Sequence, residues 1–237
     1  QKGVGLYQFM NRKGKRSSAA YAFIENQLKN PLLNLLLETT VKEIIIENEI
    51  AIGVITENQL GEEEKIFANK EVILAAGSFI TPKILMLSGL GDEEELSKFS
   101  LKCKNNIPGV GKNLVDHPEC PLIAKANGKH GYFKQGDGGR MLKNGIEFLL
   151  FGTGRVNSTG VEAGAFINPF NKNDLSYIQA FFVPSMYMNS DTLGVINDDY
   201  GMSITTVMTK PKSRGYVKLQ SSNFKDPPIL ELNLLKH

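Results

Sequence analysis

The chain has 237 residues, with 27 lysines and arginines against 25 aspartates and glutamates, which gives a formal net charge of +2. This balance argues against the strongly basic surface that nucleic-acid or anionic-membrane binding requires. The length is enough for one large domain or two modest ones. No apolar run approaches the ~20 residues of a membrane span. We therefore expect no nucleic-acid partner and no membrane span.

The two ends of the sequence bear on whether the chain is a piece of a longer protein. The chain opens at Gln1 without an initiator methionine and closes directly after a β-like run, so we expect an internal piece of a longer protein. Cys103 and Cys120 are too few for a disulfide framework. No export leader, with basic residues followed by apolar ones, precedes the apolar run of residues 31–37. Reduced thiols and a cytoplasmic location are the expectation.

The first third of the chain changes from a helical to a β-like pattern. Residues 17–29 begin with Ser17 and Ser18, which suit a helix N-cap, and carry apolar residues at helical spacing. Asn30-Pro31 ends this predicted helix. Residues 39–47, 50–56 and about 65–68 are rich in β-forming residues and are separated by turns. They predict a small antiparallel meander.

Residues 71–77, with the sequence Glu-Val-Ile-Leu-Ala-Ala-Gly, are interpreted as a buried strand that runs into small residues. A helix is predicted from about Thr81-Pro82, because proline suits the first helical position. It ends at Ser88-Gly89. A strand, a turn of small residues and a helix let a cofactor approach the backbone closely.

The second half begins with less regular segments and ends in β-like runs. Residues 92–100 predict a short acidic helix, 104–118 a loop, and 128–139 a glycine-rich loop. A helix over 141–151 should stop at Gly152. The runs 162–167, 177–183, 202–209 and 216–220 predict an antiparallel sheet. The fold class is therefore expected to be mixed, α/β and α+β.

One block of the sequence is specific enough to indicate a family. Residues 77–91 read Gly-Ser-Phe-Ile-Thr-Pro-Lys-Ile-Leu-Met-Leu-Ser-Gly-Leu-Gly, and they resemble the second signature of the glucose–methanol–choline (GMC) oxidoreductases. Further stretches resemble other blocks of that family in the same order, and they cover nearly the whole chain: residues 14–21, 108–117, 211–217 and 226–229. The chain is identified as similar to this family, and choline-dehydrogenase-like.

The resemblance implies a two-domain flavoprotein that binds FAD and passes hydride from a small-molecule alcohol to the flavin, with an undefined electron acceptor. Residues 1–14 would be a strand of the substrate domain and residues 15–118 part of the FAD-binding domain. Residues 119–237 would be part of a mainly antiparallel substrate domain. A flavin-containing hydroxynitrile lyase of the same family, and a non-catalytic relic or binding domain, remain as alternatives.

The sequence also departs from the family pattern. The Gly-x-Gly-x-x-Gly unit that binds the FAD pyrophosphate does not occur, and Gly109-x-Gly111 is no substitute, because it follows Ile107-Pro108 and not a β-run. The family's C-terminal active-site pair, His with His or Asn, is also missing. We therefore expect the chain alone to be inactive and to retain no FAD. No catalytic residue is assigned, and the base is expected to be none of His117, His130 and His237.

The resemblance assigns candidate cofactor residues to two places. Val41 would meet adenine through its backbone, and the small residues before the signature helix would let the ring system lie close. The alternative is ordinary packing of a strand on a helix. Asn113 and Asp116, with His117, could form a polar cluster near the flavin or a turn in which they bond the backbone. The candidates are Val41, Ala75, Ala76, Gly77, Asn113 and Asp116.

Glu162 is the candidate for substrate binding, because it opens an apolar strand in a stretch that resembles choline-type members. A carboxylate beside aromatic faces is what holding a quaternary ammonium requires. The alternative is a solvated strand-edge glutamate. The aromatic residues nearby in sequence are Phe166, Phe181, Phe182 and Tyr187, of which Phe166 is the second candidate for substrate binding. No metal site is expected, since the histidines are far apart and the cysteines lack ligand spacing.

Overall fold

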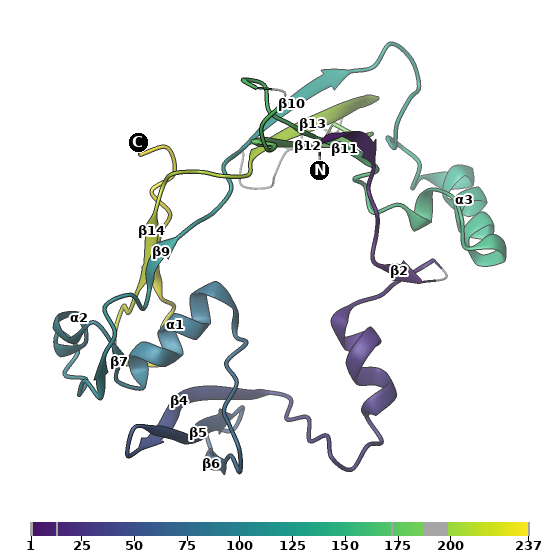
Figure 1. Cartoon of the computed structure of the whole chain (residues 1–237). Helices are drawn as coiled ribbons and strands as arrows, with labels where there is room; N and C mark the ends of the chain where they lie inside the picture. Colours follow the sequence, from purple (N-terminus) through teal and green to yellow (C-terminus); the bar gives the residue numbers. More distant parts are fainter. Residues whose placement is uncertain (1, 13, 172, 187–198, 237) are drawn as a thin grey trace. The chain divides into compact units, whose positions relative to one another are not determined.

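The computed structural model describes residues 2–12, 14–171, 173–186 and 199–236 (Figure 1). The chain divides into two compact units, and it contributes two segments to each. The first unit comprises residues 1–33 and 117–211, and the second comprises residues 34–116 and 212–237. Among the described residues, no helix is both long and apolar enough to cross a membrane.

The first unit is built on an antiparallel sheet with the strand order β1-β11-β12-β13-β10. This confirms the antiparallel pairing predicted for the runs 162–167, 177–183 and 202–209, whereas the run 216–220 was wrongly assigned to this sheet, because β14 (Gly215–Lys218) lies in a separate sheet. The strand order also confirms that the start of the chain pairs with the sheet of the first unit, because Gly3 of β1 lies opposite Phe166 of β11. The strands are β1 (Gly3–Leu6), β10 (Glu119–Lys125), β11 (Ala163–Ile167), β12 (Ile178–Val183) and β13 (Gly201–Met208).

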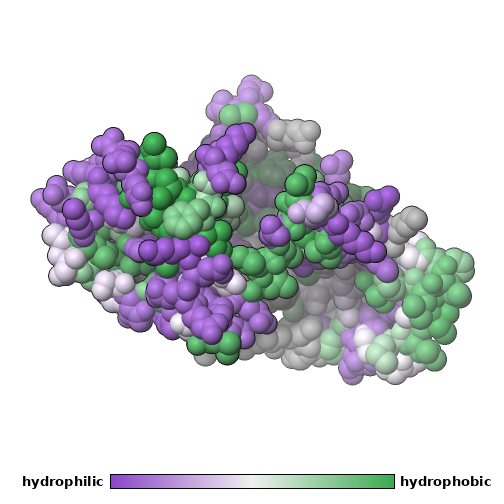
Figure 2. Space-filling model, turned by 90° about the horizontal axis from the view of Figure 1, so that it is seen from below, coloured by the Kyte–Doolittle hydropathy of each residue, from purple (hydrophilic) through white to green (hydrophobic). Residues whose placement is uncertain are grey.

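Helix α3 (Gly138–Phe151) also belongs to the first unit and ends as predicted at Gly152, whose φ of 64° is left-handed. None of its residues is buried. Its hydrophobic side chains gather at the right-hand end of the surface in Figure 2, where Figure 1 places α3. The exposed ones are Met141, Leu142, Ile146, Leu149, Leu150 and Phe151.

The helix predicted over residues 17–29 is not a regular α-helix. It consists of one π-helical turn, η1 (Ala20–Ile24), and one 3₁₀ turn, η2 (Glu25–Gln27), with no buried residue in either. Ser18 does accept a hydrogen bond from the Tyr21 amide, at 3.2 Å, as its expected capping role requires. Because no side chain of this segment packs into a core, local propensity alone does not keep it regular. The remaining short elements of the unit are β2 (Asn11–Arg12), β3 (Lys15–Arg16) and η3 (Arg155–Asn157).

The second unit contains the predicted meander, a pair of helices and three short ladders. The meander is confirmed as an antiparallel sheet in the order β4-β5-β6. The elements are β4 (Thr39–Glu47), β5 (Ile50–Asn58), β6 (Glu63–Phe67), α1 (Gly77–Leu87), β7 (Leu90–Gly91), α2 (Glu93–Ser97), β8 (Asn105–Asn106), β9 (Lys112–Leu114), β14 (Gly215–Lys218) and β15 (Ile229–Glu231).

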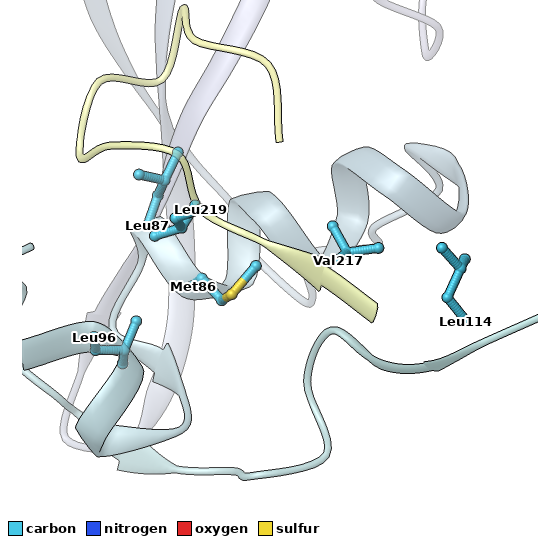
Figure 3. Close-up of a cluster of buried hydrophobic side chains, with 6 residues drawn as sticks. All are labelled: Met86, Leu87, Leu96, Leu114, Val217 and Leu219. Carbon is cyan, nitrogen blue, oxygen red and sulfur yellow. The ribbon is translucent and has the colours of Figure 1, made fainter. Parts of the chain in front are cut away.

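The core of the second unit joins α1 and α2 to strands from the middle and the end of the chain (Figure 3). Leu96 is 1% exposed and Val217 is 3% exposed, so both are fully shielded from water. The cluster consists of Met86, Leu87, Leu96, Leu114, Val217 and Leu219.

Two predictions around α1 are wrong. Residues 71–75 do not form a strand, and Ile73 is 77% exposed, because no described strand pairs with them. The helix begins at Gly77, not near Thr81, so Pro82 lies inside it and not at its first position. Pro82 has no amide proton, so the helix lacks the hydrogen bond to the carbonyl of Ser78, an exposed residue of its first turn.

The compact units group the chain differently from the ranges expected from the sequence. Residues 212–237 fold with the second unit, because β14 pairs with β9 and with β15. Residues 15–33 fold with the first unit. That the two units correspond to substrate and FAD-binding domains stays a prediction.

Candidate functional site

The N-terminal end of α1 presents small residues and open backbone. Ala75, Ala76 and Gly77 are exposed. Gly77 has a φ of +83°, and a Cβ built there meets no atom within 4 Å, so the space in front of it is open. The N-cap residue Ala76 supplies no side-chain hydrogen bond. Amides of the first helical turn that lack a capping side chain favour a negatively charged group. These residues therefore fit the close approach of a phosphate-bearing cofactor such as FAD.

A cavity of about 310 Å³ is lined both by the start of α1 and by residues of the Pro-Gly-Val-Gly block and the segment that follows it, from Gly111 to Val115. Gly111 borders this cavity, with a φ of +75°, and a Cβ there would lie 2.2 Å from the carbonyl oxygen of Val217. Only glycine allows β14 to lie this close. The cavity is lined by Ser78, Pro82, Gly111, Lys112, Asn113, Leu114, Val115 and Val217.

The predicted cofactor residues are thus brought together only in part. Asn113 lines the cavity with a left-handed φ of 60°, while Asp116 is the last residue of its segment of the second unit. Val41 is half-buried on β4, opposite Thr56 of β5. Because β4 is an edge strand of its described sheet, alternate backbone groups of β4 point away from β5. The position of Val41 is compatible with a backbone contact to a ring.

Two residues to which the sequence analysis assigned no tertiary contact fix the surroundings of α1. Ser88 Oγ accepts from the Ile44 amide at 2.8 Å and donates to the Ile84 carbonyl at 2.6 Å, which attaches β4 to the end of the helix. Lys83 is 8% exposed, and its ammonium donates to the carbonyls of Phe224 and Asp226 at 2.5 and 2.6 Å. Burial lowers the pKa of Lys83. Lys83 is the single charged residue of α1, and this is the signal that could have indicated the contact.

Glu162 lies in the first unit, directly before β11. Its amide donates to the Phe182 carbonyl at 3.3 Å, and its carbonyl accepts from the Tyr7 amide at 3.0 Å, so its backbone is held from both sides. The side chain is half-buried, and its carboxylate accepts a hydrogen bond from the hydroxyl of Tyr132. Glu162 is therefore not a strand-edge glutamate whose side chain is freely solvated.

Aromatic side chains share a sheet face with Glu162. Opposed residues of antiparallel strands lie on one face, and side chains alternate along each strand. Gly164 lies opposite Phe181, and Phe166 lies opposite Gln179, so Phe166 and Phe181 share the face to which alternation also assigns Glu162.

The remaining aromatic candidates of that stretch have different positions. Phe182 lies opposite Ala163 and so belongs to the other face of the sheet. Tyr187, like His237, is outside the described residues. Over the part of the chain that the structure describes, no group of three or more His, Cys, Asp or Glu side chains could hold a metal ion.

Two tyrosines of this region were not predicted from the sequence. Tyr7 stacks on Phe181 with ring centroids 5.6 Å apart and an interplanar angle of 24°. Its ring covers Gly164, where a Cβ would lie 2.3 Å from it. Tyr132 comes from the glycine-rich segment and contacts Glu162. Only its position as an aromatic residue among glycines could have indicated a packed role.

Comparison with known proteins bears directly on the origin of this chain. The sequence model of the family described as GMC oxidoreductase matches residues 1–119. The chain belongs to the GMC oxidoreductase family. The resemblance of residues 77–91 and the neighbouring blocks to that family is confirmed.

Curated relatives match along the whole chain. An alcohol dehydrogenase [acceptor] of Pseudomonas putida is 30% identical over 242 residues, which cover 99% of this chain and 43% of the relative. An oxygen-dependent choline dehydrogenase of Sinorhizobium fredii is 34% identical and covers 100% and 42%. The mitochondrial choline dehydrogenase of Homo sapiens is 30% identical and covers 99% and 39%. The chain therefore spans about two fifths of the length of these relatives.

Solved structures share the fold. A formate oxidase variant of Aspergillus oryzae RIB40 superposes with a TM-score of 0.84 at 24% identity, over 95% of this chain and 43% of the other. Pyridoxine 4-oxidase from Mesorbium loti gives a TM-score of 0.81 at 20% identity, over 100% and 42%. At these identities the likeness concerns the fold alone. The expected mixed architecture with mainly antiparallel sheets matches part of GMC oxidoreductase structures.

Proposed function

We propose that this chain is part of an FAD-dependent oxidoreductase that oxidises an alcohol to a carbonyl compound, with a choline-like alcohol as substrate. The observation that carries the proposal is the match of the GMC oxidoreductase family over residues 1–119. Relatives named as alcohol and choline dehydrogenases support the reaction class.

The second unit would contribute to the cofactor site. The exposed Ala75, Ala76 and Gly77 let a ring or phosphate approach the backbone, and the uncapped first turn of α1 supplies amide donors. Asn113 would supply a polar group at the neighbouring cavity. FAD, when bound, accepts hydride from the alcohol carbon. Because this sequence has no Gly-x-Gly-x-x-Gly unit, we propose that the pyrophosphate cradle comes from another part of the enzyme.

The first unit would contribute to the substrate site. Glu162 supplies a negative charge, and Phe166 and Phe181 supply aromatic surface on the same sheet face. A carboxylate and aromatic rings together attract a quaternary ammonium group. They offer no comparable attraction to a neutral alcohol. We assign no catalytic base to this chain. His117 and His130 are left with structural roles.

The proposal is tested on the intact enzyme by following the loss of flavin absorbance under anaerobic conditions. Choline and its neutral isostere 3,3-dimethylbutan-1-ol are supplied to the natural protein and to Glu162→Gln. We expect both alcohols to reduce the natural flavin. In Glu162→Gln the KM for choline should rise at least roughly tenfold while the KM for the isostere stays nearly unchanged, because one charge–charge attraction is lost.

Two results would contradict different parts of the proposal. If no alcohol reduces the flavin, the reaction class is wrong, and release of cyanide from a cyanohydrin would then point to a lyase. If the flavin is reduced but the two KM values respond alike to Glu162→Gln, the choline-like substrate is wrong.

A further inference from the structure

The carboxylate of Glu162 is the end of a chain of hydrogen bonds. The Gly160 amide donates to Ser158 Oγ at 3.0 Å, Ser158 Oγ and Tyr132 Oη are 3.0 Å apart, and Tyr132 Oη contacts Glu162 Oε1. A phenol has one proton, and it goes to the carboxylate, because a charged acceptor makes the stronger bond. The Ser158 hydroxyl must therefore donate to Tyr132. All donors in the chain point towards Glu162.

Backbone contacts hold Tyr132 in place. Its amide donates to the Pro184 carbonyl at 2.7 Å, directly beyond β12. Gly131, with a φ of +96°, allows this approach, because a Cβ there would lie 2.5 Å from the Pro184 oxygen. Ser158 is held by its amide, which donates to the Arg155 carbonyl at 3.2 Å. Two turns thus present their hydroxyl groups to the sheet at Glu162.

The surroundings keep the Tyr132 hydroxyl protonated. Burial raises the pKa of Tyr132, and its hydrogen bond to Glu162 raises this pKa further, while Ser158 and Arg155 act in the opposite direction. A protonated phenol remains a donor over the whole physiological range. Hydroxyl donors aligned in a series polarise one another, and this strengthens each hydrogen bond of the series.

We infer that Tyr132 is a positioning residue, which with Ser158 fixes Glu162 Oε1 and so directs Oε2 of the same carboxylate to the cationic group of the substrate. This inference rests on the proposed function, because it takes Glu162 as the anion that meets the cation. It adds that recognition of the cation depends on two hydroxyl groups that do not carry charge themselves.

Equilibrium binding to the intact enzyme tests the inference without turnover. The probes are tetramethylammonium and tert-butanol, which have similar size and no oxidisable CH–OH group, with dissociation constants measured by titration calorimetry. Tyr132→Phe should weaken tetramethylammonium roughly tenfold, the scale of one hydrogen bond to a charged group, and tert-butanol less than about twofold. Tyr200→Phe is the matched control: it removes a hydroxyl that accepts from Arg140 at 2.9 Å in the same unit, and it should change neither constant.

The two variants of Ser158 separate positioning from packing. Ser158→Ala should weaken tetramethylammonium in the same direction as Tyr132→Phe, and Ser158→Thr, which keeps the hydroxyl, should restore natural binding. Flavin content and the thermal midpoint are measured for each variant. If Tyr132→Phe does not fold, the comparison of Ser158→Ala with Ser158→Thr decides.

Three results would overturn the inference. One is an unchanged constant for tetramethylammonium in Tyr132→Phe, and another is an equal loss for both probes, as a purely structural contact would give. The third is natural enzyme that binds tetramethylammonium no better than tert-butanol. In that case alcohol-dependent flavin reduction would still support the proposed reaction, so the two failures are distinguishable.

Discussion

Different interactions stabilise the first unit and the second unit. In the second unit, side chains of α1, α2 and β14 form one apolar cluster, in which Leu96 is 1% exposed. In the first unit, the five strands are joined by backbone ladders, and the buried hydrophobic side chains that the structure describes there are Met186 and Val207. Side-chain burial therefore contributes more to the second unit, and backbone pairing contributes more to the first.

The helices of the two units show the same difference. Helix α1 has 11 residues and buries Lys83, Ile84, Met86 and Leu87. Helix α3 has 14 residues and buries none. An amphipathic pattern indicates that a helix has an apolar face, but only the neighbouring elements decide whether this face is covered. The following predictions test how far the difference between the units extends.

The largest expected effect is loss of core packing in the second unit. Leu96→Ala removes a side chain that is 1% exposed, and it should lower the free energy of unfolding by about 2–5 kcal/mol, from lost burial and from the cavity that remains. Leu149→Ala on α3 is the matched control, with a side chain that is 82% exposed, and it should change this free energy by less than about 0.5 kcal/mol. Urea unfolding followed by circular dichroism measures both. Equal losses would show that α3 is covered by another surface.

A second effect concerns glycines with a left-handed backbone in each unit. Gly111→Ala should cost about 2–3 kcal/mol or more, because its Cβ would lie 2.2 Å from the Val217 carbonyl oxygen in addition to the strain of a φ of +75°. Gly138→Ala at the start of α3 has a φ of +50° and no atom within 4 Å of the new Cβ. It should cost only the backbone strain, about 1 kcal/mol. The difference in thermal midpoint is the measurement, and a Gly111→Ala variant as stable as Gly138→Ala would contradict the close packing of β14 on this loop.

The smallest effect is electrostatic and depends on pH. Glu95 contacts Lys98 at 2.7 Å and Lys218 at 3.5 Å, and the hydrogen bond from Lys98 is the main reason that its pKa is lowered from the usual 4.5. Because the folded pKa is below the unfolded one, this stabilisation is present above about pH 4.5 and is lost as the pH falls through the folded pKa. Glu95→Gln should cost less than about 1 kcal/mol at neutral pH and nothing at lower pH.

The first unit offers the control for this ion pair. Lys125 and Asp199 are 3.6 Å apart with side chains 63% and 52% exposed, so Asp199→Asn should have no measurable effect at any pH. Chemical unfolding between pH 3 and pH 7 compares the two variants. A loss in Glu95→Gln that persists in acid would contradict an electrostatic origin.

Several elements were predictable from local sequence alone. The meander of β4, β5 and β6 follows from β-forming residues separated by turns, and the end of α3 follows from Gly152. The strand predicted over residues 71–77 was wrong although its composition is strand-like, because a strand also needs a partner in the folded chain. The start of α1 was misplaced because Pro82 suits a first helical position, whereas in this chain it is the sixth residue of the helix.

Family membership was determined by the sequence itself. Residues 77–91 carry a specific order of small, apolar and turn residues, and this order can be recognised in a single sequence without an alignment. The grouping of the chain into units was decided by the tertiary structure. Residues 212–237 could join either sheet on composition alone, and only the pairing of β14 with β9 places them in the second unit.

The surroundings of Glu162 were likewise decided by tertiary structure. Tyr7 and Tyr132 come from segments far from Glu162 in sequence, and the hydrogen bonds that join them to it form only when the strands are in register. Periodicity in a sequence reports what each residue does within its own strand or helix. It carries no information on which distant residue lies opposite, because that is fixed by the packing of the whole unit.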